Sequence, residues 1–396
     1  MDDVAIAGAG PAGAVAAAIL AAAGLRVRLF DRARFPRPKL CGDTLNPGAL
    51  SVLQRCFDTT SLIANSDAID GMVLTGPGGV SVRGAYGTGI TGRSITRHAL
   101  DRWLLDRAVD AGAAVEEETV IRDAVMADGR VGGVMATVHR SSLRHPARIV
   151  IAADGRRSAI AIGRGLARQP DRPRRWAIGA YFSDVAGMTR FGEMHVRRSH
   201  YIGVAPLPGG VTNVCLVVPH DRGELPLAKP ADALNAVLAA DPSLRGRFAS
   251  ARAVSPSVVL GPMAVDTAAA GEPGLLLAGD AAGFIDPMTG DGLHFALRGA
   301  ELAAGVVRDA FDGRFEIDRA HLILAKRRQQ AFEAKWRFNR ALRSLVASPA
   351  RVSAAAVAAR LLPAAFATII RYAGDCPPPH AGRSAADEQR DVRHLA

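Results

Sequence analysis

The beginning of the chain alternates short apolar runs with a helical pattern. The run Val4-Ala5-Ile6-Ala7 has the composition of a buried strand, residues 11–23 are an alanine-rich helical stretch, and residues 27–30 form a second apolar run. Gly24 follows the helical stretch and is a typical helix stop. A strand, a helix and a strand in this order are typical of a parallel β-α-β unit, so we expect an α/β fold.

The middle of the chain is richer in predicted strands. Strands are expected over residues 115–120, 121–126, 131–138 and 148–153, and as a hairpin over 72–82. Gly76-Pro77-Gly78-Gly79 and Asp128-Gly129 are typical hairpin turns. Apolar positions recur at helical spacing over residues 96–111, before Gly112. From residue 176 to 218 strand-like runs alternate with turns, which predicts a separate antiparallel sheet.

The last part returns to a strand and then to helices. Leu275-Leu276-Leu277-Ala278 reads as a buried strand, and a long helix is expected from about Gly292. A basic helix over residues 326–343 and an alanine-rich helix over 352–371 follow. Leu361, Leu362, Phe366 and Ile369 fall at helical spacing in the second of these, and we expect them in the core; a lid or a membrane surface is the alternative.

These elements predict a Rossmann-like nucleotide-binding domain that is discontinuous in sequence. We expect its three parts at residues 1–71, 96–165 and 263–325, an inserted antiparallel-sheet substrate domain at 166–262 with the hairpin 72–95, C-terminal helices at 326–374 and a disordered tail at 375–396. A length of 396 residues suits such an arrangement of two or three domains.

Composition narrows the location and the partners. The net charge is +11 and is carried mainly by arginine, but no aromatic-interleaved or helix-turn-helix pattern accompanies it, so nucleic-acid binding is not expected. The basic helix is interpreted as a solvated face, with a peripheral membrane contact or a redox-partner surface as alternatives. The four cysteines are scattered, no export signal is evident and no apolar run spans a bilayer, so we expect a cytoplasmic protein without a metal site.

The first glycine cluster predicts an anion-binding site. Gly8-x-Gly10-x-x-Gly13 lies between the first strand and the first helix, where glycines allow a tight turn, a close approach of pyrophosphate and close helix–strand packing. Asp31 ends the next strand, 18 residues beyond Gly13, and is placed to accept hydrogen bonds from ribose hydroxyls.

Four motifs in this order resemble those of flavoproteins that include geranylgeranyl reductases, aromatic hydroxylases and halogenases. They are the glycine cluster with Asp31, the run Phe35-Pro36-Arg37-x-Lys39-x-Cys41-Gly42-Asp43, the run Ala153-Asp154-Gly155-Arg156-Arg157-Ser158, and Gly279-Asp280-Ala281-Ala282-Gly283 with Pro287-x-x-Gly290-x-Gly292. The resemblance spans about residues 3–310 and implies non-covalently bound FAD.

The resemblance also implies which residues contact FAD. They are Gly8, Gly10, Pro11, Ala12, Gly13, Asp31, Arg32, Lys39, Cys41, Gly42, Arg97, Val120, Asp154, Gly155, Gly279, Asp280, Pro287, Gly290, Asp291, Gly292 and Leu293. Asp280 corresponds to the residue that binds a ribityl hydroxyl, with a helix cap as the alternative role. Arg97 is either a cofactor contact or a surface charge. Val120 is expected to end a strand, where the family's backbone contacts adenine. The helix opened by Gly290-Asp291-Gly292 would direct its positive end at the flavin.

Three side chains, Cys41, Asp43 and Asp286, are candidates for catalysis. Family reductases carry Cys-Gly-Gly beside the flavin, whereas this chain has Cys41-Gly42-Asp43, so Asp43 is either a proton carrier or a cap for a helix at Asn46-Pro47. Asp286 precedes Pro287, where the family's loop passes the flavin, and it is either a general acid or base or a solvent-facing loop residue.

The substrate pocket is expected between the flavin and the sheet over residues 176–218. Its predicted lining is Tyr181, Tyr201, Pro206 and Phe284. Related enzymes carry a central tryptophan in the segment that here reads Tyr201-Ile202-Gly203-Val204-Ala205-Pro206, so Gly203 leaves more room and disfavours halogenation.

Three classes of activity agree with these motifs. The first is a monooxygenase that hydroxylates a small hydrophobic or aromatic substrate with NAD(P)H, and the second is a reductase or dehydrogenase of C=C bonds. A non-redox flavin-dependent cyclase or binding protein is the third. No second GxGxxG follows the first, so NAD(P)H would dock transiently, and a ferredoxin or a quinone could serve instead. The sequence does not decide the oligomeric state.

Overall fold

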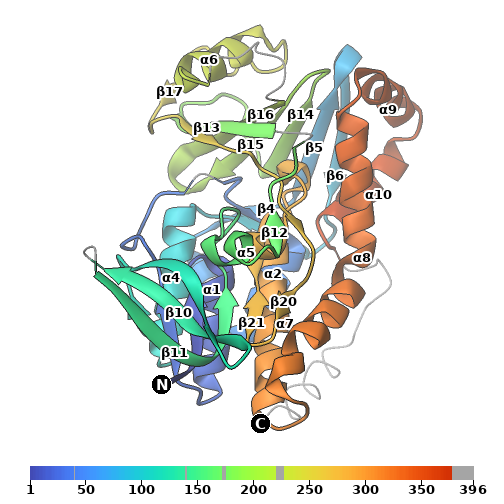
Figure 1. Ribbon diagram of the computed structural model, residues 1–396. Coiled ribbons are helices and arrows are strands. Elements are labelled where there is room, and N and C mark those ends of the chain that lie inside the picture. Colours follow the sequence, from blue (N-terminus) through green and yellow to red (C-terminus); the bar gives the residue numbers. More distant parts are fainter. Residues whose placement is uncertain (40, 139–140, 172–174, 220–226, 377–396) are drawn as a thin grey trace.

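A computed structural model describes residues 1–39, 41–138, 141–171, 175–219 and 227–376. Two large β-sheets lie one above the other, and a column of C-terminal helices runs along one side of both (Figure 1). No single helix among the described residues is long and apolar enough to span a bilayer.

The lower sheet has a parallel core. Its strands lie in the order β21 (Leu275–Leu277), β11 (Ser141–Ala152), β1 (Asp2–Ala7), β2 (Val27–Phe30) and β8 (Ala114–Glu116), with β20 (Gly271–Glu272) antiparallel at one edge. β9 (Val120–Ala127) and β10 (Arg130–Val138) continue antiparallel from the start of β11. Val4 and Ile6 pack under helices α1 (Pro11–Ala22), α4 (Arg97–Asp110) and α7 (Gly292–Phe311), whereas Ala5 and Ala7 face the β9–β10 layer.

Most predicted elements of this half are confirmed, including β2, the β9–β10 hairpin, α1 and α4, and the hairpin predicted over residues 72–82 is confirmed in the other sheet. Two boundaries are wrong. The strand expected over residues 148–153 begins earlier, at Ser141. The expected strand over residues 115–120 ends at Glu116, and Val120 begins β9 instead. Glu118 adopts a positive φ of 55° between them, so the chain turns before Val120. An apolar pattern alone does not reveal such a turn.

The upper sheet holds the residues expected for substrate binding. Its order is β17 (Arg252–Ala253), β13 (Arg175–Ser183), β16 (Val211–Pro219), β15 (Tyr201–Leu207), β14 (Phe191–Val196), β5 (Gly71–Gly76) and β6 (Val80–Ala85), and β18 (Val258–Leu260) also pairs with β13. The β5–β6 hairpin joins through a parallel pairing of β5 with β14, so the sheet is not purely antiparallel. Helix α6 (Pro230–Ala240) covers one face, and the other face looks toward the lower sheet (Figure 1).

Short elements connect the two sheets. They are β3 (Thr44–Leu45), β7 (Gly92–Ser94) and β4 (Asp67–Ile69), which form a small sheet, together with α2 (Pro47–Cys56), α3 (Thr60–Ala64), α5 (Ala159–Gly163) and the pair β12 (Ala167–Arg168) and β19 (Asp266–Thr267).

The C-terminal helices differ from the sequence prediction. Helix α8 (Ala320–Val346) contains the basic stretch, but Arg328 and Lys335 are buried, so the stretch is not simply a solvated face. The alanine-rich stretch forms two helices, α9 (Pro349–Leu361) and α10 (Pro363–Ala373), with 113° between their axes. Pro363 cannot continue the hydrogen bonding of α9, so it starts a new helix.

The break at Pro363 also makes the expected core positions wrong. Leu361, Leu362 and Ile369 are exposed and Phe366 is half-buried, whereas Ile370 is buried against β6. Asp375, expected in the disordered tail, has defined contacts, and residues 377–396 lie outside the described residues.

Candidate functional site

Three sequence motifs meet at the carboxyl ends of the parallel strands. Gly8 follows β1 with a φ of +95°, and a Cβ there would lie 2.5 Å from the carbonyl oxygen of Ala153, the residue after β11. A Cβ on Gly13 would overlap the Gly8 carbonyl, and one on Gly279 would lie 3.0 Å from Ala12 Cβ. These close approaches require glycine and leave the start of α1 at the edge of the sheet where α/β folds bind nucleotides.

Asp31 fixes the glycine loop as well as facing this edge. Its carboxylate oxygens accept the backbone N–H groups of Ala9 and Ala33, each at 2.8 Å. Each oxygen keeps a lone pair for a ribose hydroxyl. Arg32 is exposed beside it, and Val120 opens the neighbouring strand β9.

Asp154 offers an unused acceptor near the glycine loop. Its Oδ2 accepts the N–H of Ala159 at 2.9 Å, but the buried Oδ1 has no protein partner within the described residues. Burial raises the pKa of this carboxyl, although hydrogen bonds oppose the effect. Gly155 leaves open space next to it. Because buried polar atoms are normally satisfied, a hydroxyl-bearing ligand fits this place.

A buried cationic cluster lies beside the glycine loop. Arg97 is 4% exposed, and its Nε and NH2 groups donate to Asp101 at 2.7 and 2.9 Å, so the surface-charge interpretation is wrong. Arg37 also pairs with Asp101, and its NH2 lies 3.6 Å from where a Cβ on Gly10 would be. Burial lowers the pKa of Lys39, which interacts with the charges of Arg97 and Asp280.

The cluster fits a pyrophosphate. Arg37 reaches the glycine loop, and Lys39 interacts with the charges of Arg37 and Arg97, so an anionic ligand would complete the charge balance of these cations. Sequence reasoning did not assign a role to Arg37. The signal was present, because Arg37 lies inside the motif that contains Lys39, but only the tertiary structure shows that it reaches Gly10.

The second glycine motif forms a short turn that is hydrogen-bonded by a side chain of α8. Residues Gly279–Ala282 make a 3₁₀ turn without a side-chain cap, and the Asp280 carboxylate interacts with the charges of Lys39 and Arg156. Arg328 is buried and donates to the carbonyl oxygens of Ala282 at 2.7 Å and Leu277 at 3.4 Å. Burial lowers the pKa of Arg328 to about 10. This support was not foreseen from the basic pattern of α8.

Helix α8 also contacts the start of α7, through Asn339. Gly290 adopts a φ of +67°, and Asp291 then begins the helix without capping it, so the first N–H groups of α7 are left for a ligand. Asp291 instead accepts from Thr289 Oγ1 at 2.6 Å and Asn339 Nδ2 at 2.9 Å. Leu293 is buried one residue beyond Gly292.

Asp43 is a deeply enclosed carboxyl at the junction of the two sheets. Its Oδ1 accepts the N–H of Arg97 at 2.9 Å, and its Oδ2 accepts the Tyr181 hydroxyl at 2.8 Å and the Asn213 amide. Burial raises the pKa of Asp43 to about 6, although these hydrogen bonds oppose the shift. The Asn213 amide also donates to the Cys41 carbonyl at 2.6 Å. Asp43 thus joins the loop of the second motif to the upper sheet.

Asp43 does not cap the helix at Asn46-Pro47, as one alternative predicted, but binds the start of a different helix. Asn46 caps α2 by accepting the N–H of Ala49 at 2.8 Å, whereas Asp43 binds the first N–H of α4. Asp43 also has a positive φ of 52°. Non-glycine residues rarely adopt this conformation, and those that do are concentrated at functional sites.

Asp286 is neither exposed nor unpaired. It is 6% exposed, its Oδ2 accepts from Arg175 NH1 at 2.7 Å, and its Oδ1 accepts the Tyr201 hydroxyl at 2.6 Å and the N–H of Met288 at 3.1 Å. The solvent-facing interpretation is therefore wrong. A carboxylate with three donors, one of them a cation, holds the Pro287–Thr289 turn against the upper sheet, which is a positioning role.

A small cavity lies between the loops below and the upper sheet. It has a volume of about 100 Å³, and its lining comes from the 42–46 loop, the β5–β6 hairpin, β14–β16 and the 287–290 turn. Tyr201 lines it as expected, Gly203 does so too, and apolar contributions come from Ile69, Met72 and Met194. The other three residues predicted to line the cavity, Pro206, Phe284 and Tyr181, are not among its lining residues. Tyr181 instead contacts Asp43 through its hydroxyl.

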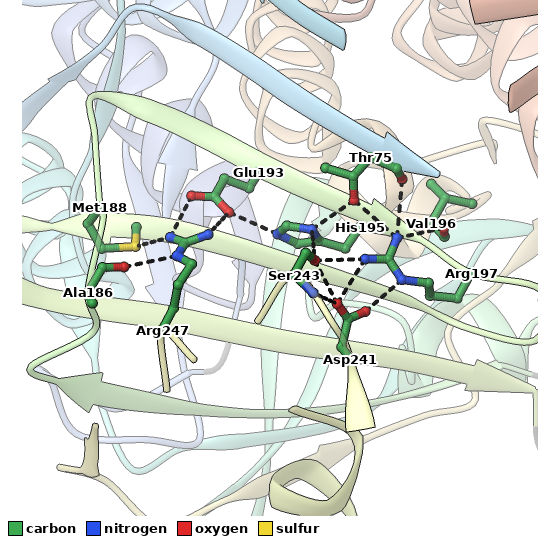
Figure 2. Close-up of polar contacts among 10 residues, drawn as sticks. All are labelled: Thr75, Ala186, Met188, Glu193, His195, Val196, Arg197, Asp241, Ser243 and Arg247. Atoms are coloured by element: carbon green, nitrogen blue, oxygen red, sulfur yellow. Dashed lines mark hydrogen bonds and ion pairs between the residues drawn. The ribbon is translucent and has the colours of Figure 1, made fainter. Parts of the chain in front are cut away.

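Glu193 is also among the lining residues of this cavity, and its carboxylate is fully engaged by hydrogen bonds. It accepts from Arg247 at 2.6 and 2.8 Å and from His195 Nε2 at 2.8 Å, as Figure 2 shows. His195 Nδ1 in turn contacts Thr75 Oγ1 at 2.9 Å. Hydrogen bonds from these partners outweigh burial and lower the pKa of Glu193. These hydrogen bonds link β14 to β5 and to Arg247. The sequence did not predict them, because their residues are far apart along the chain and follow no recognisable spacing.

The described residues contain no cluster of His, Cys, Asp or Glu that could hold a metal ion. Among known families, the model described as FAD binding domain matches residues 1–305.

Two curated relatives match most of the chain. Digeranylgeranylglycerophospholipid reductase 1 of Methanopyrus kandleri is 32% identical over 345 residues, which are 85% of this chain and 87% of that protein. Menaquinone reductase of Mycolicibacterium smegmatis is 32% identical over 325 residues, which are 76% of this chain and 75% of that protein.

Solved structures share the fold at lower identity. A geranylgeranyl bacteriochlorophyll reductase-like protein from Thermoplasma acidophilum has a TM-score of 0.75 and 22% identity, with 89% of each chain covered. The myxobacterial chondrochloren halogenase has a TM-score of 0.79 and 21% identity, with 85% of this chain and 81% of that chain covered. These two likenesses show the fold alone.

Proposed function

Because this chain belongs to the FAD binding domain family, we propose that it is a FAD-dependent reductase that saturates a carbon–carbon double bond in an isoprenoid-type substrate. It is a FAD-dependent oxidoreductase, as expected from its motifs. Two relatives at 32% identity are named as reductases of a digeranylgeranylglycerophospholipid and of menaquinone, and this supports the reductase over the hydroxylase class.

The observation that carries the proposal is the enclosed carboxyl of Asp43. Saturating a C=C bond requires a hydride equivalent on one carbon and a proton on the other. FAD, once reduced, supplies the hydride equivalent. A carboxyl whose pKa is raised to about 6 by burial keeps about a tenth of its molecules protonated at pH 7, so it can deliver the proton.

The surroundings of Asp43 support proton delivery to the cavity. Asn213 lines the cavity and donates to Asp43 Oδ2, and the partly exposed Tyr181 donates its hydroxyl to the same oxygen. We propose that Asp43 gives its proton to a substrate held in the cavity beside Asn213 and recovers a proton from solvent through the Tyr181 hydroxyl. Met72, Ile69 and Met194 make the wall of the cavity largely apolar.

The cofactor contacts are proposed from the same geometry. Asp31 and the glycine loop would hold adenosine and pyrophosphate without a covalent bond, with Arg37, Lys39 and Arg97 on the phosphate charges. Asp154 Oδ1, unsatisfied by the described residues, and Asp280 would accept ribityl hydroxyls. NAD(P)H is proposed as a transient electron donor, since no second glycine motif would hold it.

Anaerobic single turnover tests the reaction class. The enzyme is reduced without oxygen and mixed with an isoprenoid quinone or a geranylgeranyl glycerolipid, and return of the oxidised flavin spectrum is followed together with the mass of the product. We expect flavin oxidation and a product that still carries two additional hydrogen atoms after any quinol has been reoxidised to the quinone in air. Flavin oxidation only after oxygen is admitted, with a product that gains one oxygen atom, would instead establish the hydroxylase.

A variant pair tests Asp43. Asp43→Asn keeps the shape of the side chain and should leave FAD bound while slowing the anaerobic step by about 100-fold. Asp286→Asn is the matched control and should slow the same step less. An unchanged rate in Asp43→Asn would remove Asp43 from the mechanism without affecting the reductase assignment.

A further inference from the structure

The bend between α9 and α10 exposes apolar side chains that the fold does not cover. Leu361 is 75% exposed, Leu362 61% and Val357 58%. We call residues 357–369 the elbow. From residue 361 to 370 the chain contains no charged residue, and Ala364 and Ala365 are exposed as well. An uncharged and mostly exposed stretch at a bend marks an interaction surface.

The opposite face of the same helices is occupied. Ala356, Ala359 and Ile370 are buried against Val80 and Val82 of β6. The two helices together are long and apolar enough for a bent membrane span, but this packing holds them against the upper sheet. The elbow is therefore available to lie on a surface, as α9 and α10 at the edge of Figure 1 show, and not to cross a bilayer.

Charge identifies the surface. Between residues 334 and 374 the sequence contains no Asp or Glu. The basic residues of this stretch are Lys335, which is buried against Asp375, and Arg337, Arg340, Arg343, Arg351, Arg360 and Arg371. A second copy of this chain would bring the same positive charges against them and would be repelled. An apolar bend flanked by cations fits anionic lipid.

We propose that the elbow docks on the surface of an anionic lipid bilayer. Leu361 and Leu362 enter the boundary between headgroups and acyl chains, and the flanking arginines contact the lipid phosphates. The docking itself does not depend on the reaction that the enzyme catalyses. If the proposed function holds, the lipid surface is also the source of the isoprenoid substrate.

The elbow is mechanically connected to the cavity. Ile370 packs directly against Gly84 of β6, and Gly84 pairs with Met72 of β5, which lines the cavity. Tyr86, another lining residue, contacts Gly374 just after α10. One β-hairpin thus separates the lipid-facing helices from the cavity, so docking brings the cavity to the bilayer surface.

Vesicle sedimentation of the full chain tests the proposal. Protein is mixed at low salt with vesicles of phosphatidylcholine, alone or mixed with phosphatidylglycerol, and the pelleted fraction is measured. We expect pelleting with the anionic vesicles that falls as salt is raised. The double variant Leu361→Ser with Leu362→Ser should partition at least about tenfold less, because two exposed leucines no longer enter the lipid.

Matched controls separate the elbow from general stickiness. Leu143→Ser and Leu322→Ser change two other exposed leucines and should pellet like the unchanged protein. Flavin absorbance of each variant reports that it is folded, independently of turnover. Equal pelleting of the elbow variant, or no preference for anionic vesicles, would overturn the proposal. So would sedimentation velocity showing a lipid-free dimer that the elbow variant abolishes, because it would assign the elbow to a second copy.

Discussion

The face proposed to hold FAD, called the FAD face below, and the sheet that closes the cavity position their functional groups in different ways. On the FAD face, Gly8 and Gly13 bring backbone segments into direct contact, and these positions leave no room for a Cβ. On the sheet face, Tyr201, Glu193 and Asn213 are held by hydrogen bonds between side chains from distant elements. Backbone contacts tolerate no change in size, whereas a side-chain wall can be remodelled.

The largest expected effect comes from Gly13→Val on the FAD face. A Cβ at this position would overlap the Gly8 carbonyl, so α1 and β1 must separate, and we expect a loss of at least about 4 kcal/mol in the free energy of unfolding together with loss of bound FAD. Gly246→Val is the control, because a Cβ there has open space. Yellow, stable Gly13→Val protein would contradict the role of backbone contact on this face.

The pH dependence of turnover probes the junction of the two faces, where Asp43 lies. Its raised pKa of about 6 means that the acid form predominates below pH 6 and is lost above it. The anaerobic rate should therefore fall by up to about tenfold per pH unit above pH 6, and Asp43→Asn should remove that dependence. A rate that rises with pH would assign Asp43 to proton abstraction instead.

A smaller effect is expected where the FAD face uses a side chain. Arg37→Gln removes a cation next to Gly10 and should weaken FAD binding about tenfold, with a reduced dependence on salt. The exposed Arg34→Gln serves as control. Titration of the apoprotein with FAD measures both affinities, and equal affinities would remove Arg37 from the cofactor site.

The smallest effect is expected in the cavity wall. A Cβ on Gly203 would meet Met194 Cε at 3.8 Å and the Cys215 carbonyl at 3.9 Å, which are ordinary contacts. Gly203→Ala should leave FAD affinity unchanged and alter KM by less than about threefold. A larger change in KM would mean that the substrate touches Gly203 directly, and the sheet would then be as size-sensitive as the FAD face.

Short motifs in the sequence were enough to establish the family, the α/β fold and the FAD cofactor, because the backbone requirements of their glycines are local. Gly8, Gly13 and Gly279 are recognisable from the strands and helices that flank them. The same locality explains why the hairpins and the first helices of the lower sheet were predicted near their observed positions.

What the side chains contact became known only from the folded chain. Arg97 and Arg328 are both buried, but Arg97 pairs with a carboxylate and Arg328 donates to backbone carbonyls. Asp286 is paired with Arg175. Leu361 is exposed although its spacing is that of a core position. Each outcome depends on a partner distant in sequence, or on the bend at Pro363, where one helix ends and another begins in a different direction. Burial and charge pairing are properties of the assembled fold, so a linear pattern cannot specify them.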